Sequence, residues 1–189
     1  MSGPLELLGN WLENLNHEGA PVLMTDHREI HEGEAYRQDV LSSGIADGGQ
    51  IMALFWNPSG TAGKHAHTNV AMKIGGLSYG YLYENPDLAV TGTVLASINY
   101  NRAKAALKPA QWKVGSGPTI NNPGTLLAGR FLGGTDATNP NEAASRGEER
   151  SGFEWVLDPS NVYLLVARQD AGTTVPGHIE LEWYEHEET

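Results

Sequence analysis

The sequence predicts an all-β protein: an antiparallel β-sandwich of jelly-roll type, preceded by a short helical arm. Two observations support this fold class. The 189 residues include 23 Gly and 10 Pro with 40% hydrophobic residues, a composition typical of short strands joined by turns. About eight to ten short stretches also alternate between apolar and polar residues, at the spacing expected of a sandwich. We assign residues 1–19 to the arm and residues 20–189 to the sandwich domain.

The N-terminal segment, residues 4–15, has the pattern of an amphipathic helix. Its apolar residues recur at helical spacing, and they are Leu5, Leu8, Leu12 and Leu15, with Trp11 beside them. Pro4 suits the first turn, where a missing N–H costs nothing. A stripe this apolar needs a partner surface, which is either its own domain or a neighbouring subunit.

Alternation predicts the following strands in order: residues 35–41, 50–56, 67–74, 78–84, 92–99 and 126–132. Residues 50–56 are apolar on both faces, which is typical of a strand between two layers. In the strand predicted at residues 78–84, Tyr79, Tyr81 and Tyr83 share a face. Such a row of tyrosines forms either core or a contact surface for a sugar or a subunit.

Two strands near the C-terminus, residues 153–157 and 162–167, flank Asp158-Pro159-Ser160-Asn161, whose turn chemistry predicts a hairpin. Residues 178–184 alternate strictly. We expect Ile179, Leu181 and Trp183 to face inward and Glu180 and Glu182 to face water. Residues 101–123, with a turn of helix at 102–107, and residues 133–152 are expected to be loops.

Charge and composition exclude several function classes. The net charge is −11, and no cluster of Lys and Arg is present to neutralise phosphates, so we expect no nucleic-acid partner. The absence of cysteine excludes disulfides, thiolate metal sites and cysteine nucleophiles. No apolar run approaches the ~20 residues of a membrane span, and no signal peptide precedes the domain, so we expect no membrane partner.

Two histidine clusters are candidate metal sites. His65 and His67 point to one side of a strand, as in the metal-binding pair of cupins, but the Glu that cupins place a few residues later is missing. His27, Glu29 and His31 share a face if that segment is extended, although exposed strands often carry such residues. No nucleophile elbow, phosphate loop or dinucleotide fingerprint occurs. We therefore expect no catalytic centre, metal or cofactor.

Several stretches, taken in order, resemble tailed-bacteriophage virion proteins of the capsid decoration (cement) kind. They cover most of the chain after residue 27 and are Ile-His-Glu-Gly-Glu-Ala-Tyr at 30–36, Tyr-Glu-Asn-Pro at 83–86 with Thr-Gly-Thr at 91–93, Asn-Tyr-Asn-Arg at 99–102, Phe-Glu-Trp-Val-Leu-Asp-Pro at 153–159 with Tyr-Leu-Leu at 163–165, and Ile-Glu-Leu-Glu-Trp-Tyr-Glu at 179–185. The resemblance implies a trimeric or otherwise clustered β-sandwich on the virion, with no cofactor.

The expected function is to bridge neighbouring subunits of the major capsid protein on the capsid surface, after synthesis in the host bacterial cytoplasm. We expect Leu5, Leu8, Trp11, Leu12 and Leu15 to dock the arm, and Asn101 and Arg102 to order a loop at a contact. One alternative is a tail or fibre module that binds host-surface glycans near Tyr79, Tyr81 and Tyr83. The other is a cupin-like metalloenzyme that uses His65 and His67.

Overall fold

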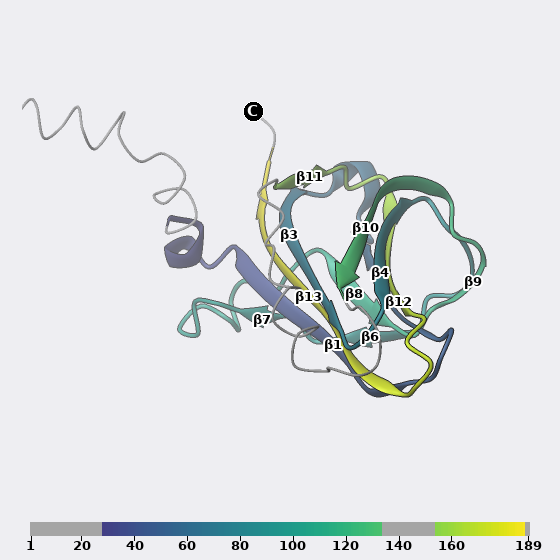
Figure 1. Ribbon diagram of the computed structural model, residues 1–189. Helices are drawn as coiled ribbons and strands as arrows, with labels where there is room; N and C mark the ends of the chain where they lie inside the picture. Colours follow the sequence, from purple (N-terminus) through teal and green to yellow (C-terminus); the bar gives the residue numbers. More distant parts are fainter. Residues whose placement is uncertain (1–27, 134–153, 188–189) are drawn as a thin grey trace, which may run out of the picture.

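The computed structural model describes residues 28–133 and 154–187, in which two antiparallel sheets pack face to face (Figure 1). The predicted β-sandwich is therefore confirmed, whereas the predicted arm at residues 4–15 lies outside the described residues. Sheet A has the order β11-β3-β13-β1-β7, with β1 (Ala35–Ile45), β3 (His65–Ile74), β7 (Ile98–Asn99), β11 (Trp155–Leu157) and β13 (Val175–His186).

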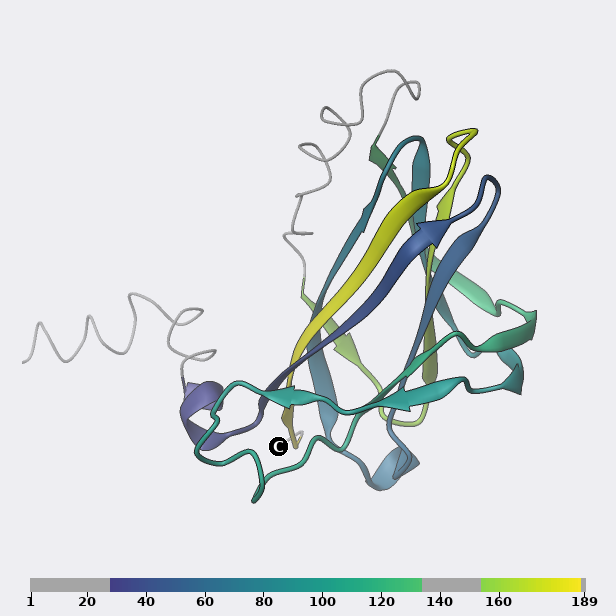
Figure 2. The same ribbon diagram turned by 90° about the horizontal axis from the view of Figure 1, so that it is seen from below.

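Sheet B has the order β10-β4-β12-β2-β8-β6. Its strands are β2 (Gln50–Trp56), β4 (Ser78–Glu84), β6 (Thr93–Leu95), β8 (Lys113–Ser116), β10 (Thr125–Gly133) and β12 (Val162–Gln169). A separate two-stranded ribbon is formed by β5 (Asp87–Val90) and β9 (Thr119–Asn122). The short 3₁₀ helix η1 spans Gly60–Ala62, and residues 28–32 are helical. Figure 2 shows this helical segment and the chain around β7 at the same end of the sandwich.

The core between the sheets follows the alternation of β13. Ile179 and Leu181 are completely buried and Trp183 nearly so, whereas Glu180 and Glu182 point away from the core, as predicted. The Trp183 ring reaches across to Phe55 of sheet B in an edge-to-face contact, with ring centroids 5.1 Å apart. Each aromatic pair of this kind adds stability beyond the area that it buries.

The central strands β2 and β12 of sheet B carry buried side chains on both faces. Ala53 and Phe55 of β2 belong to the core shared with sheet A, whereas Leu54 belongs to a second apolar cluster on the opposite face. The ribbon covers this second cluster through Leu88 and Ile120. The prediction that residues 50–56 lie between two layers is confirmed.

A buried carboxylate joins β13 to the segment that precedes β8. Glu185 is 2% exposed, and its side chain accepts hydrogen bonds from the backbone N–H of Gln111 (3.0 Å), the backbone N–H of Trp112 (2.9 Å) and the indole N–H of Trp183 (3.1 Å). Burial raises the pKa of Glu185, and these hydrogen bonds oppose that rise. The carboxylate therefore fixes where β13 sits relative to residues 111 and 112.

The hairpin predicted at residues 158–161 is wrong. A turn does form there, because the Asn161 N–H donates to the Asp158 carbonyl at 3.1 Å and the Ser160 N–H donates to the Asp158 carboxylate at 2.8 Å. However, β11 pairs with β3 in sheet A, and β12 pairs with β2 and β4 in sheet B. Turn residues specify a reversal of the chain, whereas burial of β12 on both faces decides which sheet it joins.

Two further segments differ from the prediction. The strand expected at residues 92–99 is divided between β6 in sheet B and β7 in sheet A. The loop expected at residues 101–123 contains β8 and β9, and residues 102–107 form turns. Glycine there suggests a loop, but a Cβ on Gly115 would lie 3.2 Å from the Trp56 ring and closer still to the Thr91 carbonyl, so glycine permits the close packing of β8. Among the described helices, none is long and apolar enough to cross a membrane.

We expect Glu185→Gln to lower the free energy of unfolding by about 1–3 kcal/mol, because the amide nitrogen would face the Gln111 N–H and leave a buried donor unpaired. Urea denaturation measures this change. The matched control is Glu187→Gln, which alters an exposed carboxylate two residues further along and should change stability by less than about 0.5 kcal/mol. Equal effects of the two substitutions would contradict the role given to Glu185.

Candidate functional site

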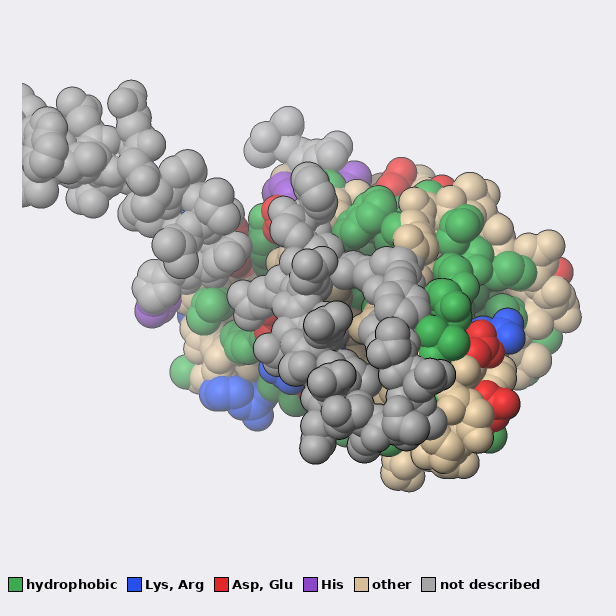
Figure 3. All heavy atoms as spheres, viewed as in Figure 1, with side chains coloured by type: hydrophobic (Ala, Val, Ile, Leu, Met, Phe, Trp, Pro, Cys, Tyr) green, Lys and Arg blue, Asp and Glu red, His purple; other side chains and the backbone are tan. Residues whose placement is uncertain are grey.

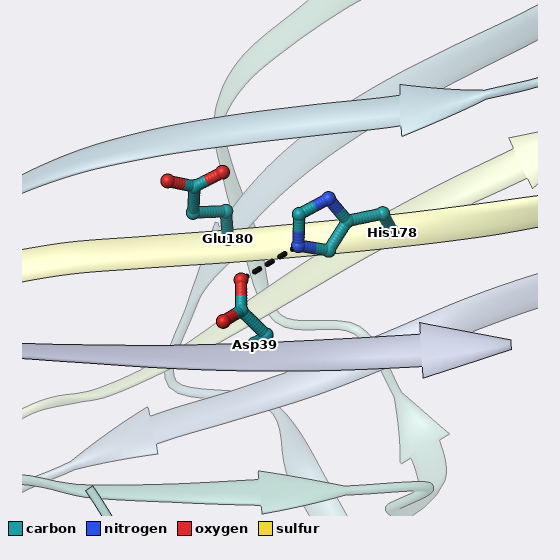
Figure 4. Close-up of side chains that lie close together, drawn as sticks. All are labelled: Asp39, His178 and Glu180. Carbon is teal, nitrogen blue, oxygen red and sulfur yellow. Dashed lines mark hydrogen bonds and ion pairs between the residues drawn. The ribbon is translucent and has the colours of Figure 1, made fainter. Parts of the chain in front are cut away.

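The outer face of sheet A carries polar side chains from adjacent strands. Asp39 of β1 lies directly opposite Glu180 of β13, and His178 precedes Glu180 by two residues on the same face. Potential ligand atoms of these three side chains lie within 4.8 Å of one another (Figure 4). Asp39 Oδ1 and His178 Nε2 are hydrogen-bonded at 2.7 Å. Two carboxylates and an imidazole at this separation are a set that can hold a divalent cation.

An arginine already binds both carboxylates of this cluster. Arg37 donates two hydrogen bonds of 3.1 Å to the two carboxylate oxygens of Asp39, and its other terminal nitrogen lies 3.2 Å from Glu180. Burial raises the pKa of Asp39, but the hydrogen bonds from Arg37 and His178 outweigh it, so the pKa is lowered below its ordinary value of 3.8. The cluster is thus an ion-pair network that joins β1 to β13.

A cavity of about 240 Å³ lies beside this network. His67, Asn69, Tyr100, Glu182 and Tyr184 contribute most of its polar groups. The Tyr100 hydroxyl donates a hydrogen bond to Glu182. Burial and the neighbouring Glu182 raise the pKa of Tyr100, so that hydroxyl keeps its proton at neutral pH. The cavity therefore offers aromatic faces and hydrogen-bonding groups, which suit a small polar molecule.

The structure brings the predicted His65–His67 pair next to a third histidine. β3 pairs with β13 so that His65 lies opposite His186 and His67 opposite Tyr184. The His67 ring stacks on Tyr184 with centroids 4.7 Å apart, and its centroid lies 4.2 Å from that of His186. Glu154, the first described residue after 133, lies 3.4 Å from His67 Nδ1.

Sequence reasoning missed His186 and Glu154 as neighbours of this pair. The signal for His186 was available, because the alternation of residues 178–186 places every even-numbered residue on the outer face. The register between β3 and β13, which places His186 opposite His65, cannot be obtained from either strand alone.

The second predicted cluster, His27, Glu29 and His31, does not form a shared extended face. His27 lies outside the described residues, and residues 28–32 are helical, so the assumed geometry is wrong. Helical spacing instead brings Glu29 close to Glu32, and the turn that ends the helix, in which the Glu34 N–H donates to the Glu29 carbonyl at 2.9 Å, adds Glu34. Lys64 and Lys108 lie 2.9 and 2.8 Å from Glu34, and Arg28 lies 2.9 Å from Glu29. These ion pairs give the acidic residues a structural role.

The predicted partner-binding residues fall in two regions. Leu5, Leu8, Trp11, Leu12 and Leu15 lie outside the described residues. Asn101 orders its loop: its side chain donates to the His31 carbonyl at 2.9 Å and accepts from the Ala103 N–H at 3.2 Å. Arg102 is exposed beside it. Whether this loop contacts a partner stays a prediction.

An apolar surface lies on the outer face of sheet B, beside the part that the ribbon covers. Tyr79, Tyr81 and Tyr83 are half-buried there, and Leu126 of β10, which pairs with Tyr83, is 54% exposed. We call these four residues the tyrosine face. Figure 3 shows hydrophobic side chains gathered on this side of the molecule, over β10 and β4. Sequence reasoning identified the tyrosines but not Leu126.

No protein-family model matches this sequence, and no curated protein matches it either.

We expect Asp39→Asn to destabilise the protein by about 1–2 kcal/mol at pH 7, because it removes a charge-assisted pair with Arg37. Since the folded-state pKa of Asp39 lies below 3.8, ionised Asp39 adds stability above about pH 4, and this contribution is lost as the pH falls through the folded-state pKa. The difference from the unmodified protein should thus shrink between pH 7 and about pH 2. Urea denaturation across this range measures it.

The control for this experiment is Asp87→Asn, which changes an exposed carboxylate in the ribbon. It should have a small effect that does not depend on pH in the same way. A difference for Asp39→Asn that stays constant down to about pH 2 would show that ionisation of Asp39 is not the cause.

Proposed function

We propose that this protein is a structural virion protein that decorates and stabilises a phage capsid by bridging neighbouring capsid subunits. In this proposal its partner is the major capsid protein, and it acts as a homo-oligomer, with a trimer favoured. Its place is the capsid surface, and it is made in the host bacterial cytoplasm. The observation that carries the proposal is the tyrosine face, an apolar surface on the outer side of sheet B.

The composition of the tyrosine face suits a protein partner. Tyrosine is enriched in protein interfaces because its ring buries a large area while its hydroxyl keeps a hydrogen-bond partner. Next to these side chains, β10 ends sheet B, and among the described strands none pairs with its outer edge. An apolar surface beside an unpaired strand edge is a common place for a second chain to dock.

The strand order supports the jelly-roll part of the proposal. The order β11-β3-β13-β1 in one sheet faces the order β10-β4-β12-β2 in the other. The successive pairs β1 and β2, β3 and β4, β10 and β11, and β12 and β13 each place one strand in either sheet. Eight strands that alternate between two sheets in this way are typical of jelly rolls, which occur widely in viral capsids.

A decoration protein needs only moderate affinity at each contact. A standard interface buries about 1,600 Å² in total, and simultaneous contacts by a symmetric oligomer multiply their effect. We propose the tyrosine face as one contact and the apolar arm of Leu5, Leu8, Trp11, Leu12 and Leu15 as a second. The loop ordered by Asn101 and followed by Arg102 is a third.

We expect the double substitution Tyr81→Ser and Leu126→Ser to reduce attachment to capsids that lack this protein by about tenfold or more, because hot-spot residues each contribute about 1–2 kcal/mol or more. Cryo-electron microscopy of the mixtures should show regular density on the icosahedral shell with the unmodified protein only. The control is Leu41→Ser, which changes an exposed leucine of β1 in sheet A and should leave attachment unchanged.

The arm is tested separately with Leu8→Ser and Leu12→Ser, which should abolish attachment while the domain keeps its unfolding transition. Density at the tail alone, or no density with the unmodified protein, would overturn the decoration proposal.

A second candidate is a tail or fibre module that binds host glycans. It is favoured by a polar group at the end of β4, where Asn161 donates to Glu84 at 2.9 Å and Asn85 donates to Asn161 at 3.0 Å. Sugar-binding sites combine an aromatic ring, which stacks on the sugar ring, with polar groups that form hydrogen bonds with the sugar hydroxyls. The amide and carboxylate groups beside Tyr83 offer this combination. Binding of host-surface polysaccharide that is lost in Asn161→Ala, without binding to capsids, would favour this candidate.

A further inference from the structure

We infer that His67 and His186, on adjacent strands of sheet A, bind a divalent transition metal ion such as Zn²⁺, Ni²⁺ or Cu²⁺. This inference is independent of the proposed virion function. It rests on the spacing of two imidazoles, an unpartnered nitrogen and a group that orients one ring.

The two imidazoles are held together by the sheet. His67 of β3 and His186 of β13 lie on the same outer face, and their ring centroids are 4.2 Å apart with the planes at 52°. Rings tilted in this way can turn nitrogens toward a common point with small rotations of the side chains. Imidazole is the ligand that Zn²⁺, Ni²⁺ and Cu²⁺ share.

One nitrogen of this pair lacks a partner. His186 Nδ1 is buried, and no atom of residues 28–133 or 154–187 makes a hydrogen bond with it. A buried polar atom without a partner costs free energy, and a metal ion bound there would remove that cost.

Neighbouring side chains fix the orientation of the other ring. His67 Nδ1 lies 3.0 Å from the Tyr184 hydroxyl and 3.4 Å from Glu154 Oε2. In the tautomer that carries the ring proton at Nδ1, the lone pair is at Nε2 and is available to a metal ion. A carboxylate that orients a histidine through its second nitrogen is the usual support of a metal ligand.

The Asp39–His178–Glu180 cluster is a weaker candidate, although its atoms are closer together. The guanidinium of Arg37 contacts both carboxylates, and Asp39 already bonds to a His178 ring nitrogen. A metal ion would have to displace a fixed positive charge there. At the histidine pair two nitrogens supply the protein ligands, and water completes the coordination.

The test is calorimetric titration of the full chain with ZnCl₂ and with NiCl₂ at about pH 7.5, where neutral histidine predominates. We expect one ion per chain, and His186→Ala should weaken binding at least tenfold. Loss of the orienting carboxylate in Glu154→Gln, at a partly exposed position that is unimportant for the core, should weaken it about tenfold.

The matched control is His178→Ala, which removes a histidine from the same strand and the same face. It should leave the affinity unchanged. No binding by the unmodified protein, or weakening by His178→Ala with none by His186→Ala, would overturn the inference.

A second measurement does not depend on the folding of any variant. Bound Cu²⁺ should give an electron paramagnetic resonance spectrum with superhyperfine splitting from two imidazole nitrogens. A spectrum that shows oxygen ligands only would also overturn the inference.

Discussion

The register of β13 between β1 and β3 is the constraint on which the rest of the structure depends. Successive side chains of a strand point to opposite faces, so a slip of one residue would bring Glu180 and Glu182 into the core and expel Ile179 and Leu181. The same slip would separate His186 from His67 and Glu180 from Arg37. The core, the ion pairs and the histidine pair thus share a single structural cause.

Glu185 is a charged residue on the face of β13 that otherwise carries apolar side chains, and its hydrogen bonds explain how the register is held. Its side chain points to the inner face, where a carboxylate without partners would be strongly destabilising. Three N–H groups donate hydrogen bonds to it there. Apolar contacts between strands tolerate small shifts, whereas hydrogen bonds to Gln111, Trp112 and Trp183 are met at one position only. The buried carboxylate therefore gives specificity at the cost of desolvation, which explains the direction of its pKa.

Local sequence patterns predict the strands whose burial is regular. They do not predict which strands pair with one another across long stretches of the chain. β2 and β4 coincide with the predicted residues 50–56 and 78–84, because each shows a clear alternation or a continuous apolar run bounded by turn residues. The turn at Asp158 was recognised but misread as a hairpin, since turn chemistry carries no information about sheet membership. The pair His65 and His67 is visible in the sequence because the two residues are close along the chain. His186 follows His67 by 119 positions and becomes its neighbour only through strand pairing. The virion assignment comes from resemblance and remains a proposal.

Pairing of an early strand with a late one has a consequence for synthesis on the ribosome. β1 is translated long before β13, and sheet A lacks its central strand until residue 186 has emerged. Until then Phe55 and the inner face of β2 have no opposing sheet to pack against. The growing chain therefore carries uncovered apolar strands from the synthesis of β2 until β13 is complete, a state that favours aggregation and gives chaperones a substrate. Expression at lower temperature, with slower aggregation of nascent chains, should accordingly raise the yield of folded protein.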